Sequence, residues 1–84
     1  PQDVQKIRKA LSETEGVESV IHLKTLYIGP EELMLGAKIA VSENSSGQDI
    51  ARIIDLAEAA VRAVMPVAKT IYLEPDILRS KTNA

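Results

Sequence analysis

The stretch from Leu33 to Ser42 restricts the possible folds more than any other part of the chain. Its odd positions are aliphatic and belong on one face of a strand: Leu33, Leu35, Ala37, Ile39 and Val41. Its even positions are small or mixed in character: Met34, Gly36, Lys38 and Ala40. Because side chains alternate along a strand, this pattern predicts one face in the core. The opposite face is then either solvated or packed closely against another subunit.

Two segments with helical spacing lie on either side of the strand pair. Residues 3–15 place Val4, Ile7 and Leu11 on one face of a helix, and Gly16 follows where a left-handed cap belongs. Residues 47–65 form a second predicted helix, which ends at Pro66. Its apolar stripe consists of Ile50, Ile53, Ile54, Ala57, Val61 and Val64. Ser46, three residues before Asp49, has the spacing of a capping box.

Two further strands complete the predicted order of elements. Residues 17–28 alternate imperfectly, which indicates a bulge, and a turn at 29–32 joins them to the second strand. Residues 67–73 form a closing strand that we expect to end at Glu74 and Pro75. The order helix, strand, strand, helix, strand predicts an α+β two-layer sandwich (α-β-β-α-β), with both helices on one face of a three-stranded sheet. The uncovered face is a candidate dimer surface.

The length of 84 residues allows one domain, which we assign to residues 1–76, followed by a flexible tail at 77–84. The chain lacks Phe and Trp and has two Tyr, so its core must be aliphatic and thin. Burial against a partner would therefore help such a core. No apolar run approaches the ~20 residues that cross a bilayer. The start at Pro1, without Met, suggests a domain from a longer protein.

Several functional classes are excluded by composition. A net charge of −2 and few aromatic residues argue against a nucleic-acid partner. Without Cys, the chain has no disulfide and no Cys-based zinc site. It has no P-loop and no G-x-S-x-G segment, and Ser46 is better explained as a helix cap than as a nucleophile. We therefore expect a protein that is not an enzyme.

Four residues remain as candidate functional residues. His22 is the single imidazole, and it is either a half-exposed strand residue or a metal ligand. Glu74 and Asp76 flank Pro75, and they are either solvated or able to bind a divalent cation. Tyr72 points away from the core side chains of its strand, so it is either exposed or an interface anchor. We take Glu74 and His22 as candidate metal ligands and Tyr72 as the candidate interface residue.

Three segments, taken in order, resemble the C-terminal cytoplasmic domain of the cation diffusion facilitator (cation efflux) family: "GVESVIHLKTLYIGP", "LMLGAKIAV" and "IYLEP". They are similar to that domain's first, second and closing strands. The resemblance implies a ferredoxin-like, metallochaperone-like fold at the cytoplasmic face of a membrane. It implies a divalent metal/proton antiporter as the parent, with a homodimeric partner and a membrane-embedded part in the same chain. In zinc-responsive members, metal at the dimer interface draws the two domains together.

The same resemblance implies that the usual metal ligands are missing. The first-strand His of metal-binding members falls on Ile21, the second-strand His on Ala37 or Lys38, and the last-strand His on Tyr72. Only the carboxylate before Pro is kept, as Glu74. We therefore expect zinc or a similar metal to bind weakly or not at all in this domain, and dimerisation to proceed without the binuclear site.

Two other readings stay open at this point. One is a stand-alone ferredoxin-like regulatory domain that binds a small ligand, for which residues 44–47 are the only plausible loop. The other is a soluble metallochaperone, which the missing Cys-x-x-Cys disfavours. Membrane spans directly upstream in the parent would decide for the transporter.

Overall fold

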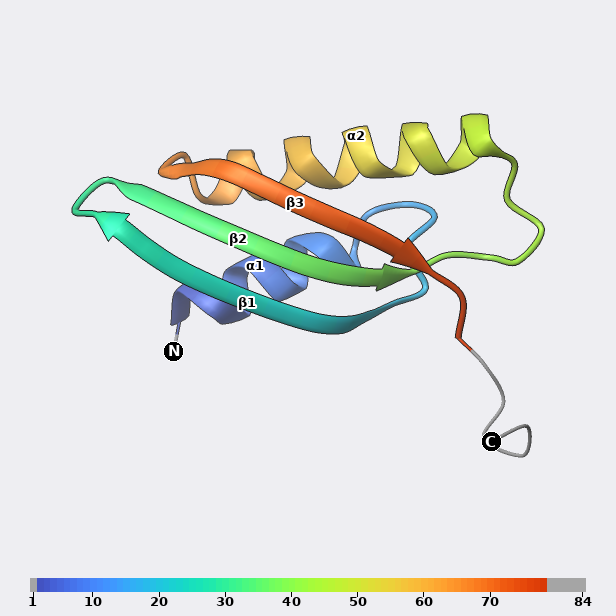
Figure 1. Ribbon diagram of the computed structural model, residues 1–84, viewed down its shortest axis with the longest axis horizontal. Coiled ribbons are helices and arrows are strands. Elements are labelled where there is room, and N and C mark those ends of the chain that lie inside the picture. Colours follow the sequence, from blue (N-terminus) through green and yellow to red (C-terminus); the bar gives the residue numbers. More distant parts are fainter. Residues whose placement is uncertain (1, 79–84) are drawn as a thin grey trace.

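The computed structural model describes residues 2–78, which form two helices and three strands (Figure 1). The elements follow the predicted order: α1 (Gln2–Ser12), β1 (Ser19–Gly29), β2 (Glu32–Ala40), α2 (Gly47–Val64) and β3 (Ala68–Asp76). Within the described residues, no helix is both long and apolar enough to cross a membrane.

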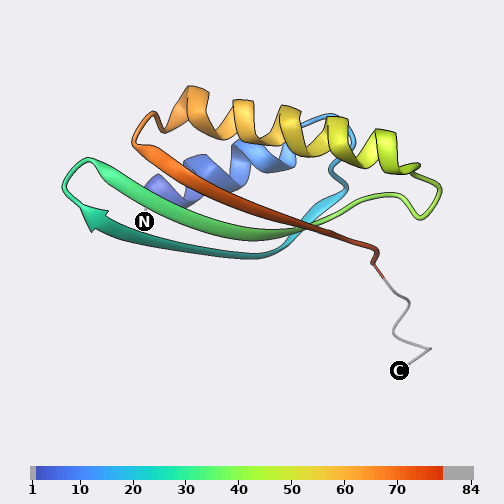
Figure 2. The same cartoon turned by 45° about the horizontal axis from the view of Figure 1, so that its top comes forward.

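The strands form one sheet in the order β1-β2-β3. β1 runs antiparallel to β2, and β3 runs parallel to it after the crossover through α2. Both helices lie on the same side of the sheet (Figures 1 and 2). The predicted α-β-β-α-β two-layer sandwich is therefore confirmed. The opposite side of the sheet, which no described element covers, is called the bare face below.

The alternation predicted for β2 holds from Leu33 to Ile39 and breaks at Ala40, which is 0% exposed despite its even position. Leu33, Leu35 and Ile39 are at most 1% exposed on the helix side, whereas Met34 and Lys38 on the bare face are half-buried. The central position of β2 explains the clean pattern, because neighbours on both sides hold its register.

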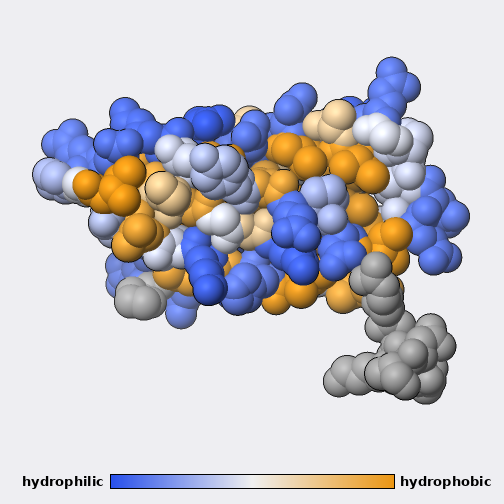
Figure 3. All heavy atoms as spheres, in the orientation of Figure 1, coloured by the Kyte–Doolittle hydropathy of each residue, from blue (hydrophilic) through white to orange (hydrophobic). Residues whose placement is uncertain are grey.

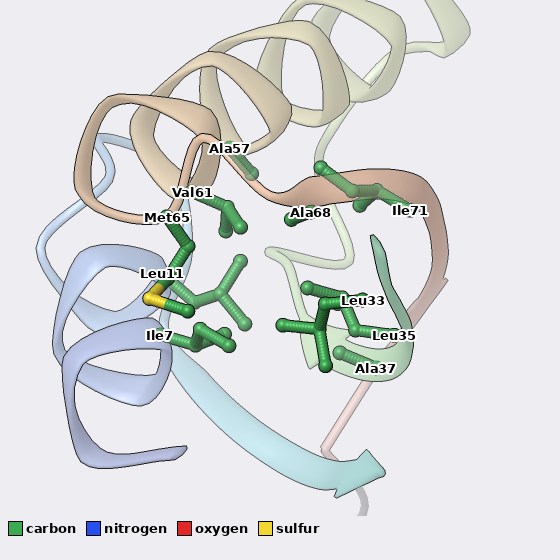
Figure 4. Close-up of a cluster of buried hydrophobic side chains, with 10 residues drawn as sticks. All are labelled: Ile7, Leu11, Leu33, Leu35, Ala37, Ala57, Val61, Met65, Ala68 and Ile71. Atoms are coloured by element: carbon green, nitrogen blue, oxygen red, sulfur yellow. The ribbon is translucent and has the colours of Figure 1, made fainter. Parts of the chain in front are cut away.

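The core lies between the helices and the sheet and is aliphatic throughout (Figure 4). Its main cluster joins side chains from both helices and from β2 and β3: Ile7, Leu11, Leu33, Leu35, Ala37, Ala57, Val61, Met65, Ala68 and Ile71. A smaller cluster contains Val17, Ile39, Val41 and Ile53. Burial of one Leu or Ile stabilises the fold by about 1.5–3 kcal/mol, so a few large side chains provide most of the stability of this layer.

The apolar stripe of α2 is narrower than its sequence indicates. The buried side chains repeat every four residues at Ile53, Ala57 and Val61, and Met65 takes the next place. Val64 was predicted on this stripe, but it is 42% exposed. Each helical residue turns by about 100°, so Val64 lies one step aside from Met65 and outside the core.

The capping box at the start of α2 is formed as predicted. The hydroxyl of Ser46 accepts a hydrogen bond from the backbone N–H of Asp49 at 3.0 Å, and the Asp49 carboxylate accepts one from the Ser46 backbone N–H at 3.0 Å. These bonds satisfy helix-terminal donors that would otherwise lack partners. The Ser46 backbone N–H is also the main reason that the pKa of Asp49 lies below its ordinary value.

The end of α1 differs from the predicted boundary. The helix stops at Ser12 rather than at residue 15, and the Thr14 hydroxyl donates to the Ala10 carbonyl at 2.8 Å. Gly16 has the predicted left-handed backbone, with φ of 97°. A Cβ added there would lie 2.5 Å from the Cγ1 atom of Ile53, so glycine at this position lets α2 pack closely.

The outer strands show one confirmed prediction and one error. β1 carries the predicted irregularity as register shifts between Val20 and His22 and between Tyr27 and Gly29. The prediction that β3 ends before Glu74 is wrong, because the strand continues to Asp76 through Pro75. β3 is an edge strand, and proline is tolerated where one row of N–H groups needs no partner.

Candidate functional site

The bare face is built from cross-strand rows that the register aligns. One row contains two apolar side chains and a threonine: Leu26, Met34 and Thr70. The next contains Lys24, Gly36 and Tyr72, and the third, which we call the charged row, contains His22, Lys38 and Glu74. Neighbouring strands lie about 4.8 Å apart, so each row brings three side chains close together.

An open groove crosses the middle of the bare face. Its lining comes from all three strands: His22, Lys24, Gly36, Ala37, Lys38, Tyr72, Leu73 and Glu74. Gly36 lies between Lys24 and Tyr72 and leaves a hollow, because it has no side chain to fill the centre of its row. The nearest atom to a Cβ added at Gly36 would be the Tyr72 carbonyl oxygen, at 4.0 Å. Packing within the chain therefore does not require glycine here.

Tyr72 stands on the bare face and is 66% exposed, and Leu26 is 59% exposed. Figure 3 shows the molecule from the side where the strands lie in front of α1, and hydrophobic areas there are broken by hydrophilic ones. A surface of this mixed kind resembles a protein interface with a few anchors more than it resembles a domain core.

The two candidate metal ligands lie in one row, but another residue separates them. His22 pairs with Lys38 across β1 and β2, and Lys38 pairs with Glu74 across β2 and β3. The Lys38 Nζ lies 3.7 Å from Glu74 Oε2 and 3.8 Å from Asp76 Oδ2. Both carboxylates therefore lie beside the ammonium group of Lys38.

The residues present do not fit a metal centre. Within residues 2–78, no three His, Asp or Glu side chains converge as a ligand group. Two or three well-placed protein ligands are the minimum for a firm zinc or similar site. A protonated lysine cannot contribute as a ligand, because its ammonium has donors and no lone pair.

The positions carried over from the family resemblance can also be located. Ile21 lies at the register shift of β1 and is 40% exposed. Ala37 is buried on the helix side, whereas Lys38 lies on the bare face beside Glu74. Of the two residues aligned with the second-strand His, Lys38 is thus the one on the face of Tyr72 and Glu74.

The ion pairs of Lys38 with Glu74 and Asp76 were not predicted from the sequence. Its even position in β2 placed it on the bare face, but its partners depend on the parallel register between β2 and β3. No local turn connects these strands, so that register cannot be derived from neighbouring residues. The available signal was that Lys38 is the only charged residue among the even positions of the predicted strand 33–42.

The loop considered for a small ligand is engaged in local structure. Ser46 caps α2, and the Asn44 backbone N–H donates to the Ser42 hydroxyl at 3.1 Å. Asp49 also lies 3.4 Å from the Arg52 guanidinium. These polar groups serve the helix start, which is the usual role of such residues.

Comparison with known families matches residues 1–76 to the family described as "Cation efflux protein, cytoplasmic domain". Among solved structures, a double variant of MamM-CTD gives a TM-score of 0.86 at 22% identity and covers 94% of each chain. A cadmium form of a MamM CTD variant gives 0.86 at 20% identity, covering 93% of this chain and 96% of that one. A nickel form gives 0.84 at 22% identity, covering 94% and 100%. The comparison with curated proteins gave no match.

Proposed function

The chain belongs to the family of cation efflux protein cytoplasmic domains, and from that premise we propose that it joins two copies of a transporter through the bare face of its sheet. The family resemblance seen in the sequence is confirmed, and the fold agrees with that of the MamM CTD structures. Membership gives the chain two partners, a second copy of itself and the membrane part of its transporter. The family is one of transporter domains rather than of enzymes.

The observation that carries the proposal is the missing layer on the bare face. Both helices cover the other side of the sheet, so Tyr72 and Leu26 stay exposed in a single copy. The aliphatic core is thin, and a second copy would bury additional apolar surface. Tyr72 is suited as an anchor, because tyrosine buries a large area with few rotatable bonds.

The proposal assigns metal a minor part in pairing. Several MamM CTD structures are of cadmium, copper and nickel forms. In this chain, His22 and Glu74 are the remaining ligand candidates, and Lys38 lies between them. We therefore expect weak metal binding and a dimer that does not depend on it. The domain then acts at the cytoplasmic side of the membrane as a dimerisation unit, with any metal response secondary.

The direct test is the molar mass in solution, measured by light scattering after gel filtration. It is recorded once with EDTA and once with excess zinc. We expect the mass of a dimer in both conditions. A monomer in both conditions contradicts the proposed function, and a dimer only with zinc contradicts its independence from metal.

Tyr72→Asp tests the placement of the interface. A charge at the centre of the bare face should raise the dimer dissociation constant at least tenfold, about 1.4 kcal/mol, because the carboxylate would have to be desolvated. Analytical ultracentrifugation over a dilution series measures this constant.

The matched control is Leu56→Asp. Leu56 is an exposed apolar residue on α2, on the opposite side of the molecule. It should leave the dissociation constant unchanged if the bare face forms the interface. A dimer weakened by Leu56→Asp and not by Tyr72→Asp would place the interface on the helices instead.

A further inference from the structure

Lys38 lies at the centre of the charged row. In the described ion pairs, the ammonium group near Glu74 and Asp76 is that of Lys38. Its side chain is 36% exposed, and that of Asp76 is 26% exposed, so part of this contact is shielded from water. The arrangement is specific to the bare face, because the other described ion pairs join neighbours on the helices.

We propose that Lys38 is a resident cation that takes the place of a divalent metal on the bare face, and that its charge keeps His22 and Glu74 from forming a metal site. The inference rests on the proposed function in one respect: it takes the bare face as the place where a metal ion would bind. It extends that function by naming the residue that makes the domain insensitive to metal.

The geometry supports this role. His22 and Glu74 are separated by two strand spacings, about 10 Å between backbones, so one ion could touch both only above Lys38. That space lies beside the Lys38 ammonium. The Coulomb repulsion between an ammonium and a divalent ion at such distances opposes binding even in a polar surrounding.

The carboxylates are affected in a second way. Asp76 Oδ1 accepts the Ile77 backbone N–H at 2.8 Å, while Oδ2 faces Lys38. Glu74 Oε2 also faces Lys38. An incoming cation would compete with the ammonium for both carboxylates. Pairs as exposed as these contribute little to folding, so the main effect of Lys38 is on what the face can bind.

The experiment measures zinc binding to the 84-residue chain by isothermal titration calorimetry near neutral pH. The variant is Lys38→Gln, which keeps the length of the side chain roughly and removes its charge. We expect its zinc dissociation constant to be at least tenfold lower than that of the unchanged chain. Adding His22→Ala to that variant should abolish the gain.

Two controls separate the local effect from net charge. Lys24→Gln removes the same charge from the next row of the bare face, where the cross-strand neighbours are Gly36 and Tyr72. It should bind zinc like the unchanged chain. Lys38→Arg keeps the charge and should also bind like the unchanged chain.

The proposal is overturned if Lys38→Gln binds zinc no tighter than Lys24→Gln. It is also overturned if the unchanged chain already binds zinc tightly and loses this binding in His22→Ala. His22, Lys38 and Glu74 belong to one chain but lie on the face proposed for pairing, so the zinc affinities of the variants are compared at the same state of association. Light scattering of the same samples reports separately on the dimer, so failure of the proposed function would be recognised as such.

Discussion

The two faces of the sheet are made by the same three strands and differ in almost every physical respect. On the helix side, Leu35 and Ile39 are at most 1% exposed and contact other aliphatic side chains. On the bare face, Gly36 leaves a hollow, Tyr72 is exposed and Lys38 forms ion pairs. The alternation of a strand thus assigns the core to one face and leaves the other for the proposed dimer contact. Substitutions at adjacent positions should separate these two roles.

Leu35→Ala should have the largest effect of these substitutions. It removes a fully buried side chain and leaves a cavity, which should lower the free energy of unfolding by about 2–5 kcal/mol. Met34→Ala, one position earlier and on the bare face, should cost clearly less. Urea denaturation followed by circular dichroism measures both. Equal losses would mean that the two faces contribute alike to folding.

Ser46→Ala tests how much the N-terminal cap of α2 contributes to the stability of the fold. Loss of the cap of α2 should lower the free energy of unfolding by about 1 kcal/mol. The folded-state pKa of Asp49 lies below its unfolded value, so its stabilisation is present above that value and is lost as the pH falls. Denaturation of the unchanged chain between about pH 6 and 3 should show this loss, since the unfolded value is about 4.

The variant Ser46→Ala should show a smaller loss between these pH values, because the capping box that holds the Asp49 carboxylate is incomplete. Its dimer mass should match that of the unchanged chain. A variant that keeps the full acid dependence would show that the pKa of Asp49 is set elsewhere.

Gly36→Ala should have the smallest effect on folding of these substitutions. It should also distinguish most clearly between the effect on stability and the effect on the dimer. A Cβ meets nothing closer than 4.0 Å, so relief of glycine entropy should raise stability by a few tenths of a kcal/mol, up to about 1. The methyl group fills the hollow, so the dimer should weaken. Thermal unfolding in dilute solution and ultracentrifugation measure the two quantities.

Gly47→Ala is the matched control for this variant, because a Cβ at the start of α2 would meet no atom within 4 Å. It should leave the dimer constant unchanged. An unchanged constant in Gly36→Ala as well would show that the hollow is not part of the interface.

The order and layering of the elements could be predicted because each rests on short-range periodicity. The alternation of β2, the stripe of Ile53, Ala57 and Val61, and the capping box at Ser46 are all local patterns. Errors arose where tertiary context decided. Val64 has the right residue type for the core, but Met65 takes the place. Pro75 lies inside a strand because that strand is at an edge.

The candidate site was predicted less well than the fold. Its residues His22, Glu74 and Tyr72 share the bare face, a grouping that was not predicted, because Glu74 was expected to follow the end of its strand. Their relation to Lys38 depends on the register of a parallel pair whose strands are joined through a helix. Such long-range pairing leaves no signature in adjacent residues, so the ion pairs of Lys38 could be found only in three dimensions.

The interruptions in the two outer strands have a consequence for solubility. β1 carries two register shifts and β3 carries Pro75, so neither offers a long, regular row of free backbone groups. Unprotected rows of that kind recruit further strands and seed aggregates or fibrils. A domain that forms homodimers is exposed to this risk of aggregation. Irregular borders favour the contact that we propose through the bare face, where a twofold arrangement would close after two chains.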